Sequence, residues 1–149
     1  METNWTLRKV LPNDVDRIAA HGQYREEHAH HRPGYAAWAR PRIEAGTYLG
    51  WLAIAEGAVI AGAGALLLDW GPTRSNPCGQ MARIVNVFTD EAWRRRGIAR
   101  TLMAAVLRDC EAKGIREFNL AASPEAHSLY VALGFDAYPA EMRRRVAAI

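Results

Sequence analysis

Cysteine, lysine and long apolar runs are all scarce in this chain of 149 residues. Two cysteines, Cys78 and Cys110, are too few for a disulfide framework, and their surroundings do not resemble a metal site. Lys9 and Lys113 are the only lysines, so arginine supplies nearly all of the positive charge. The apolar run at 59–68 is too short, and too interrupted by glycine, to span a membrane.

The overall composition is that of an ordinary globular domain. Hydrophobic residues make up 50% of the chain and charged residues 23%, and the net charge of +3 suits an anionic ligand without requiring nucleic acid. The first residues contain no basic segment followed by an apolar run, so we expect no secretory signal and a cytoplasmic location. No repeat or linker divides the chain, which predicts a single domain over 1–149.

Local sequence signals alternate between strand and helix patterns. They predict an α+β domain with a central mixed sheet of six to seven strands, flanked by about four helices, in the order β-α-α-β-β-β-α-β-α-β(-β). Gly62 and Gly64, inside a predicted strand, indicate bulges or a close approach of the backbone. The predicted strands are 5–10, 48–56, 58–69, 81–89, 115–121 and one or two short strands within 135–146, and the predicted helices are 12–22, 35–45, 97–113 and 123–134.

The most informative stretch is 89–103, where a strand end, a basic turn and a helix start follow one another. The turn from Arg94 to Ala99 has the pattern Arg-x-x-Gly-x-Ala. At a helix start the first N–H groups are unpaired and the helix dipole is positive, and Gly97 and Ala99 leave the main chain accessible. With the arginines beside it, this turn is predicted to bind phosphate.

Two other interpretations of the arginines remain: a solvated corner, or a basic patch that binds nucleic acid. Asp90 and Glu91 lie directly beside the arginines, and the arginines adjoin a glycine turn, which argues against nucleic acid. A dinucleotide-binding domain is disfavoured as well, because the turn lacks the Gly-x-Gly-x-x-Gly pattern.

A second motif follows at 126–135, with the pattern Ala-x-x-x-Tyr-x-x-x-Gly-Phe. With both motifs present in this order, and one strand between them, the chain closely resembles the GNAT superfamily of acyl-CoA-dependent N-acyltransferases. The resemblance is specific over 81–142 and extends to the strand pair 48–69, but it does not cover the first forty or so residues.

This resemblance implies acetyl-CoA as the cosubstrate and an amine as the acceptor. It places the CoA pyrophosphate on the basic turn, the pantetheine arm along the preceding strand, and the thioester carbonyl at an N–H near Val87. The implied cofactor-binding residues are Asn86, Val87, Phe88, Thr89, Arg94, Arg95, Arg96, Gly97, Ile98, Ala99 and Arg100. No metal is implied.

Tyr130 occupies the position at which the family has a tyrosine that protonates the departing thiolate of CoA. The resemblance therefore implies that Tyr130 is the general acid, and a phenol with a pKa near 10 is well matched to a thiol. Spacing alone favours a packing role instead, because Tyr130 lies on the same side of its helix as Leu129 and Leu133.

The general base and the acceptor remain open. Many family members have a carboxylate on the strand before the turn, whereas this chain has Arg83 and Asn86 there. The spacing of the histidines favours a solvated loop over a metal site. A non-catalytic acyl-CoA-binding or sensing domain is the alternative function, and dimers are frequent in the family. Candidate bases are Glu26, Glu27, His28, His30, His31 and Asp69, of which Glu26, Glu27 and Asp69 are the candidate substrate-binding residues.

Overall fold

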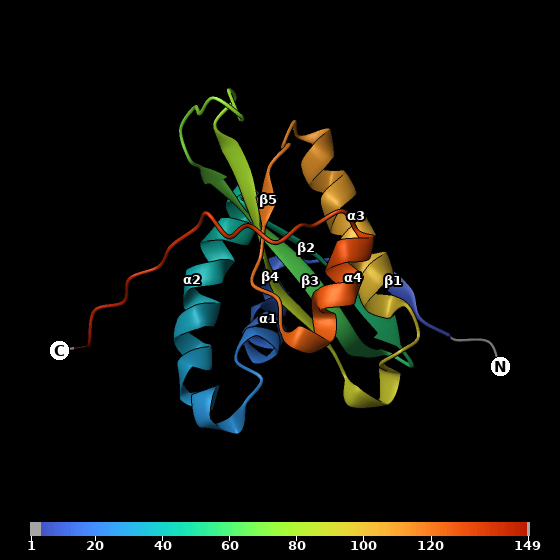
Figure 1. The fold of residues 1–149 in the computed structure, drawn as a ribbon. Coiled ribbons are helices and arrows are strands. Elements are labelled where there is room, and N and C mark those ends of the chain that lie inside the picture. The colour runs from blue at the N-terminus through green and yellow to red at the C-terminus, as the bar shows by residue number, and fades with distance from the viewer. Residues whose placement is uncertain (1–3, 149) are drawn as a thin grey trace.

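A five-stranded sheet forms the centre of the molecule (Figure 1). The computed structural model describes residues 4–148. The strands lie in chain order, antiparallel from β1 to β4, and β5 runs parallel to β4. Their bounds are β1 Thr6–Lys9, β2 Tyr48–Ala55, β3 Ala58–Asp69, β4 Gln80–Thr89 and β5 Phe118–Asn119.

Helices cover both faces of this sheet (Figure 1). The helices α1 and α2 pack against each other on one face, and α3 packs on the other beside α4. The four α-helices of residues 4–148 agree with the predicted number, and the α+β class is confirmed. Their bounds are α1 Val15–Gly22, α2 Arg32–Ala45, α3 Ile98–Ala112 and α4 His127–Ala132, with short 3-10 helices η1 Pro12–Asp14, η2 Glu26–His31, η3 Glu91–Trp93 and η4 Pro124–Ala126.

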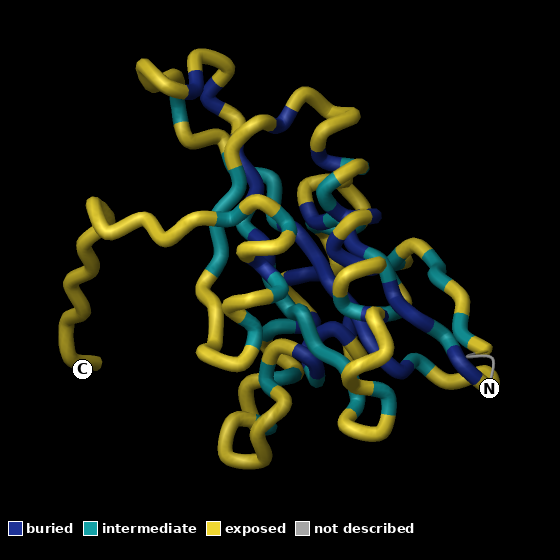
Figure 2. The backbone as a smooth tube through the Cα atoms, turned by 45° about the vertical axis from the view of Figure 1, so that its right-hand side comes forward, coloured by how far each residue is buried: buried dark blue, intermediate teal, exposed yellow. Residues whose placement is uncertain are grey.

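The main core lies between α3 and the sheet, where Figure 2 shows the longest buried segments. The apolar side of α3 repeats at helical spacing, and its residues are almost completely buried. Many of the strand residues that face it are alanines, so the helix can approach the sheet closely. This packing fixes the start of α3 at the end of β4. The α3 residues concerned are Ile98, Leu102, Met103, Val106 and Cys110.

The prediction of six to seven strands was wrong, because the sheet of the described residues has five. Residues 135–146 form no strand in the described chain; instead residues 136–148 are exposed and extend away from the body (Figure 2). An apolar alternation becomes a strand only when another strand supplies hydrogen bonds, and none in residues 4–148 lies beside it. The strand predicted over 115–121 is also shorter, because it pairs with β4 only at Phe118 and Asn119.

Gly62 and Gly64 flank an irregularity of the sheet, as expected. The register between β3 and β4 shifts between them, although the extra residue lies on β4, and the groups that approach the two glycines are side chains from other elements, not backbone. A Cβ atom at Gly64 would overlap the hydroxyl oxygen of Tyr48 and lie 2.8 Å from its Cζ, whereas a Cβ at Gly62 would lie 2.9 Å from Nδ1 of His21. The absent side chains therefore provide the space for Tyr48 and His21.

Gly64→Ala is expected to lower the free energy of unfolding by about 1–3 kcal/mol, because the buried, rigid ring of Tyr48 must move. Gly34→Ala in α2 is the matched control, since its Cβ would meet nothing within 4 Å. That control is expected to be neutral or to stabilise by up to about 1 kcal/mol. Urea unfolding of both variants measures the difference, and equal effects would contradict the close contact.

Candidate active site

The turn between β4 and α3 is built around two residues with left-handed backbone conformations. β4 ends at Thr89, η3 follows, and Arg95 and Gly97 then have φ angles of 63° and 78°. Glycine adopts such angles without steric cost, whereas an arginine does so rarely. Ile98, only 1% exposed, anchors the first residue of α3 in the core directly after this turn.

The backbone N–H groups of this turn are available to a ligand. Within residues 4–148, the first hydrogen bond of α3 runs from the N–H of Thr101 to the carbonyl oxygen of Gly97, at 3.1 Å, and the N–H groups of 95–100 have no partner there. A Cβ atom at Gly97 would meet nothing within 4 Å, so the space in front of the turn is open. Unpaired N–H groups at a helix start are a site for an anion such as a diphosphate.

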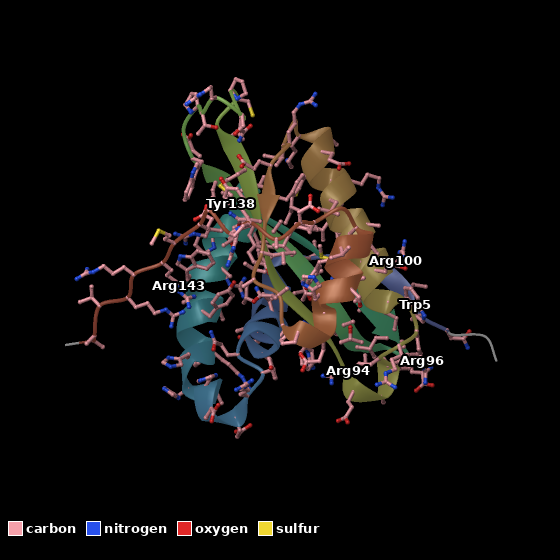
Figure 3. All side chains as sticks on the ribbon, in the orientation of Figure 1. Trp5, Arg94, Arg96, Arg100, Tyr138 and Arg143 are labelled. Atoms are coloured by element: carbon pink, nitrogen blue, oxygen red, sulfur yellow. The ribbon has the colours of Figure 1, made fainter. Side chains whose placement is uncertain are left out.

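Three arginines, Arg94, Arg96 and Arg100, lie near this turn (Figure 3). Arg94 folds back so that its Nε donates to the carbonyl oxygen of Thr89 at 2.9 Å. Arg96 lies over the ring of Trp93, 4.7 Å from its centroid, and Arg100 is exposed on the first turn of α3. The positive charge therefore adds to the helix dipole at the place where an anionic ligand would bind.

The end of β4 has a free edge beside this turn. β4 pairs with β5 only at Ala82 and Arg83, so within the described chain residues 84–89 have no partner strand on that side. A bulge lies within this segment, because the two residues Asn86 and Val87 are opposite the single residue Ala63. An extended ligand that carries amides can pair with such an edge through main-chain hydrogen bonds.

Asn86, at the bulge, connects three elements of the fold. It has a φ of 56°, a conformation that asparagine tolerates better than most residues. Its Nδ2 donates to the hydroxyl oxygens of Tyr35 on α2 and Tyr48 on β2, each at 2.8 Å. Burial raises the pKa of both phenols, so both stay neutral. The sequence analysis missed both tyrosines; Gly64 makes room for Tyr48, and no local pattern pointed to Tyr35.

His21 is a second buried group that the sequence analysis missed. It is 5% exposed, and its ring stacks on that of Phe88 with 5.2 Å between centroids. Its Nε2 has no hydrogen-bond partner in the described part of the chain. Burial, with a smaller effect from the charge of Arg17, lowers the pKa of His21 to about 4. The imidazole is therefore neutral at physiological pH.

This low pKa predicts a loss of stability in mild acid. The unfolded imidazole, with a pKa of 6.5, takes up a proton before the folded one does, so the contribution of His21 is complete above pH 6.5 and is lost as the pH falls towards 4. Between pH 7 and 4.5 the free energy of unfolding is expected to fall by about 2 kcal/mol more in the unaltered protein than in His21→Gln, which cannot titrate. Urea unfolding at both pH values measures this, and parallel losses would contradict the assignment.

Tyr130 on α4 belongs to the core between α3 and the sheet. Its side chain is 7% exposed and meets the ring of Phe135 edge-on, with 6.0 Å between centroids. Its hydroxyl makes no side-chain hydrogen bond in residues 4–148, and partial burial raises its pKa. Val87, at the bulge, packs against the same core cluster. The structure thus places this phenol and the bulge of β4 on the same face of the sheet.

The other predicted site residues are divided between the two ends of the molecule. Asp69 pairs with Gln80 at the start of β4, which is about 30 Å along the strand from Thr89 at 3.3 Å per residue. The exposed Glu26 and Glu27 lie on η2, at the same end of the molecule as the basic turn (Figure 1). Glu27 lies 3.8 Å from Arg25. The structure therefore brings Glu26 and Glu27, but not Asp69, to the end where the turn lies.

Two further findings concern the described residues as a whole. In residues 4–148 no three or more histidines, cysteines or acidic residues are grouped so that they could hold a metal ion. Within the same range, no helix has both the length and the apolar character that crossing a membrane requires.

A family model described as an acetyltransferase (GNAT) domain matches residues 18–146, and the chain belongs to this family. No curated protein sequence matches the chain. This match confirms the resemblance to the GNAT superfamily that the two sequence motifs indicated.

Solved structures of acetyltransferases share the fold. A GCN5-related N-acetyltransferase from Ralstonia eutropha JMP134 is 26% identical, with a TM-score of 0.88 over 97% of this chain and 100% of that one. A predicted acetyltransferase from Clostridium acetobutylicum, solved with acetyl-CoA, is 19% identical, with a TM-score of 0.87 over 95% and 96%. The aminoglycoside acetyltransferase AAC(6')-Iy, solved with the bisubstrate analogue CoA-S-monomethyl-acetylneamine, is 21% identical, with a TM-score of 0.77 over 98% and 100%.

Proposed function

We propose that this protein transfers the acetyl group of acetyl-CoA to a primary amine of a small molecule or peptide, by direct attack in a ternary complex. The observation that carries the proposal is the start of α3, where unpaired N–H groups and an open glycine lie beside the free edge of β4. The thioester supplies the activated acetyl group, and the residues of this chain hold it and move the protons.

The turn would bind the diphosphate of the cosubstrate. The N–H groups of 95–99 act as donors, and the side chains of Arg94, Arg96 and Arg100 add positive charge. One such contact at a helix start contributes only about 0.3–1 kcal/mol, so affinity requires several donors acting together. Residues 86–89 would hold the pantetheine amides, and the N–H of Val87 would bind the carbonyl oxygen of the thioester.

Tyr130 would act as the general acid, with its hydroxyl donating a proton to the departing sulfur. Burial raises the pKa of Tyr130, which keeps the proton on the phenol before the reaction. The ordinary pKa values of a thiol and a phenol lie within about two units of each other, so a proton can pass from the phenol to the departing thiolate.

The acceptor amine would approach from the face that α1 and α2 cover. There the rings of His21 and Tyr24 pack on Phe88, and Tyr35 reaches the bulge of β4. The exposed carboxylates of Glu26 and Glu27 lie at this end, where they would attract a cationic amine and accept its proton through water. The bisubstrate complex of AAC(6')-Iy, a protein of the same fold, supports an amine acceptor.

A thiol-release assay with acetyl-CoA tests the proposal across amines, amino acids, aminoglycosides and peptides. We expect CoA release that depends on the amine and saturates with acetyl-CoA. Calorimetry with acetyl-CoA alone distinguishes the alternative function, because a sensing domain would bind the cosubstrate without turning it over. Absence of binding would reject both functions.

A further inference from the structure

The side-chain amide of Asn86 lies between the two helices of one face and the sheet. Its Nδ2 donates to the hydroxyl oxygens of Tyr35 on α2 and Tyr48 on β2, each at 2.8 Å. Its Oδ1 lies against the last residue of α1, since a Cβ atom at Gly22 would overlap that oxygen. Contacts with three other elements therefore fix the position of one amide at the bulge of β4. Asn86, Tyr35 and Tyr48 together form an amide clamp.

Two glycines from separate elements provide the space for this clamp. Gly22 leaves room for the amide of Asn86, and Gly64 on β3 leaves room for the phenol of Tyr48, because a Cβ atom at either position would overlap the polar group. Neither glycine has a positive φ angle, so the backbone conformation does not require glycine at these positions. Space for the clamp is the structural reason for both.

The clamp acts on a backbone conformation that needs support. Asn86 has a φ of 56°, in the left-handed region, which asparagine tolerates but does not favour. It is also one of two residues that lie opposite the single residue Ala63, and the extra residue of a bulge is left out of the regular ladder of hydrogen bonds. The side chain of Asn86 therefore supplies a restraint that the ladder does not.

Asn86 also determines the direction of the next N–H group along the strand. The peptide group between Asn86 and Val87 is planar and rigid, so the N–H of Val87 can turn only by rotation about the two single bonds that flank this group. Val87 packs in the core beneath α3, which restrains one end of the peptide group. The amide clamp restrains the other end, on the opposite face of the sheet.

The two phenols of the clamp are anchored differently. Tyr48 is 2% exposed and belongs to the central sheet, so its hydroxyl has a fixed position. Tyr35 is half-buried on α2, and the centroid of its ring lies 5.4 Å from that of Trp38. Removing the hydroxyl of Tyr35 therefore disturbs the core less than removing that of Tyr48, and it still takes away one of the two bonds that hold the amide.

We propose that Asn86 is a positioning residue for acetyl transfer. This proposal rests on the proposed function, in which the N–H of Val87 binds the carbonyl oxygen of the thioester. As the amine nitrogen bonds to the acetyl carbon, that oxygen gains negative charge, and a donor stabilises the charge best when it already points to the place where the charge develops. The amide clamp holds the peptide group of Asn86 and Val87 in that direction, so the bulge need not reorganise during the reaction.

Infrared spectroscopy of bound acetyl-CoA, carrying carbon-13 at the acetyl carbonyl, tests the proposal without turnover. A hydrogen bond weakens the carbonyl bond, so we expect a narrow band at lower wavenumber than for acetyl-CoA in water. Asn86→Gly removes the amide but keeps the freedom to adopt a positive φ. This variant should bind acetyl-CoA with almost unchanged Kd, because the basic turn is not altered, but its carbonyl band should broaden and return towards the position in water.

Steady-state kinetics separates positioning from a purely structural role. Asn86→Gly should lower kcat by about 10²-fold, the effect expected when a catalytic group is displaced by about 1 Å. Tyr35→Phe should lower kcat less. The double variant Tyr35→Phe/Asn86→Gly should be no slower than Asn86→Gly alone, because Tyr35 acts through the amide. Tyr138→Phe loses a hydroxyl outside the clamp, at a side chain that is 70% exposed, and should keep full turnover. Circular dichroism at the assay temperature verifies that each variant is folded.

The outcomes distinguish this proposal from the proposed function. Absence of acetyl-CoA binding in the unaltered protein would reject both. Binding without a shift of the carbonyl band, a shift that persists in Asn86→Gly, or losses of kcat that multiply in the double variant would reject the positioning role alone. If Asn86→Gly does not fold, Tyr35→Phe decides by itself: a carbonyl band and a kcat equal to those of the unaltered protein would overturn the proposal.

Discussion

Tyr130→Phe is expected to lower kcat for acetyl transfer by about 10²–10⁴-fold, the usual contribution of a positioned general acid, and to leave the Kd of acetyl-CoA unchanged. The change removes one oxygen that makes no side-chain hydrogen bond in residues 4–148, where burial alone raises the pKa of Tyr130, so the stability of the fold should not change. Only the proton for the departing sulfur is lost.

Steady-state kinetics measures kcat, and calorimetry measures the Kd of acetyl-CoA. Because burial raises the pKa of Tyr130, the unaltered enzyme should keep its acid up to at least pH 10, and loss of this proton should not limit kcat below that pH. Tyr138→Phe, in the exposed C-terminal segment, is the matched control and should keep full turnover. If kcat and affinity fall together in Tyr130→Phe, or if neither changes, the acid assignment is wrong.

Gly97→Asp is expected to weaken the binding of CoA by about 100-fold, close to 3 kcal/mol. The new carboxylate would stand in the open space before the N–H groups of 95–99, where it repels the diphosphate and competes for the same donors. A residue other than glycine is also strained at a φ of 78°.

Gly114→Asp is the control that separates the effect of backbone strain on stability from the loss of CoA binding. Gly114 follows the other end of α3 with a φ of 86°, and a Cβ there also meets nothing within 4 Å. Both variants should lose similar stability in urea, but only Gly97→Asp should lose CoA affinity in calorimetry. Equal affinities in the two variants would place the diphosphate elsewhere.

The elements around the basic turn could be predicted because their signals are local. The apolar spacing of α3, the glycine before it and Gly114 after it lie within one stretch of sequence, and the structure ends the helix within a residue or two of the prediction. The hairpin at Glu56 and Gly57 is equally local, since both residues have the positive φ angles that a tight turn requires.

Contacts between distant parts of the chain could not be predicted in this way. Asn86 meets Tyr35 and Tyr48 across separations of 51 and 38 residues, and no local pattern indicates that pairing. The missing C-terminal strands have the same cause, since alternation shows that a segment can be a strand but not that a partner lies beside it. Asp69 was a candidate for substrate binding by residue type alone, and the register of β3 takes it to the far end of the sheet.

The bulge in β4 also determines which way each later side chain of the strand points. Ala82 and Ile84 face α3, and a regular strand would turn Phe88 to that face as well. The extra residue reverses the alternation, so Val87 packs beneath α3 while Phe88 reaches His21 on the opposite side. Deleting Asn86 would therefore remove the bulge but leave Val87 opposite Ala63 and Phe88 opposite Gly62, so both side chains would keep their faces and only the hydrogen bonds to Tyr35 and Tyr48 would be lost.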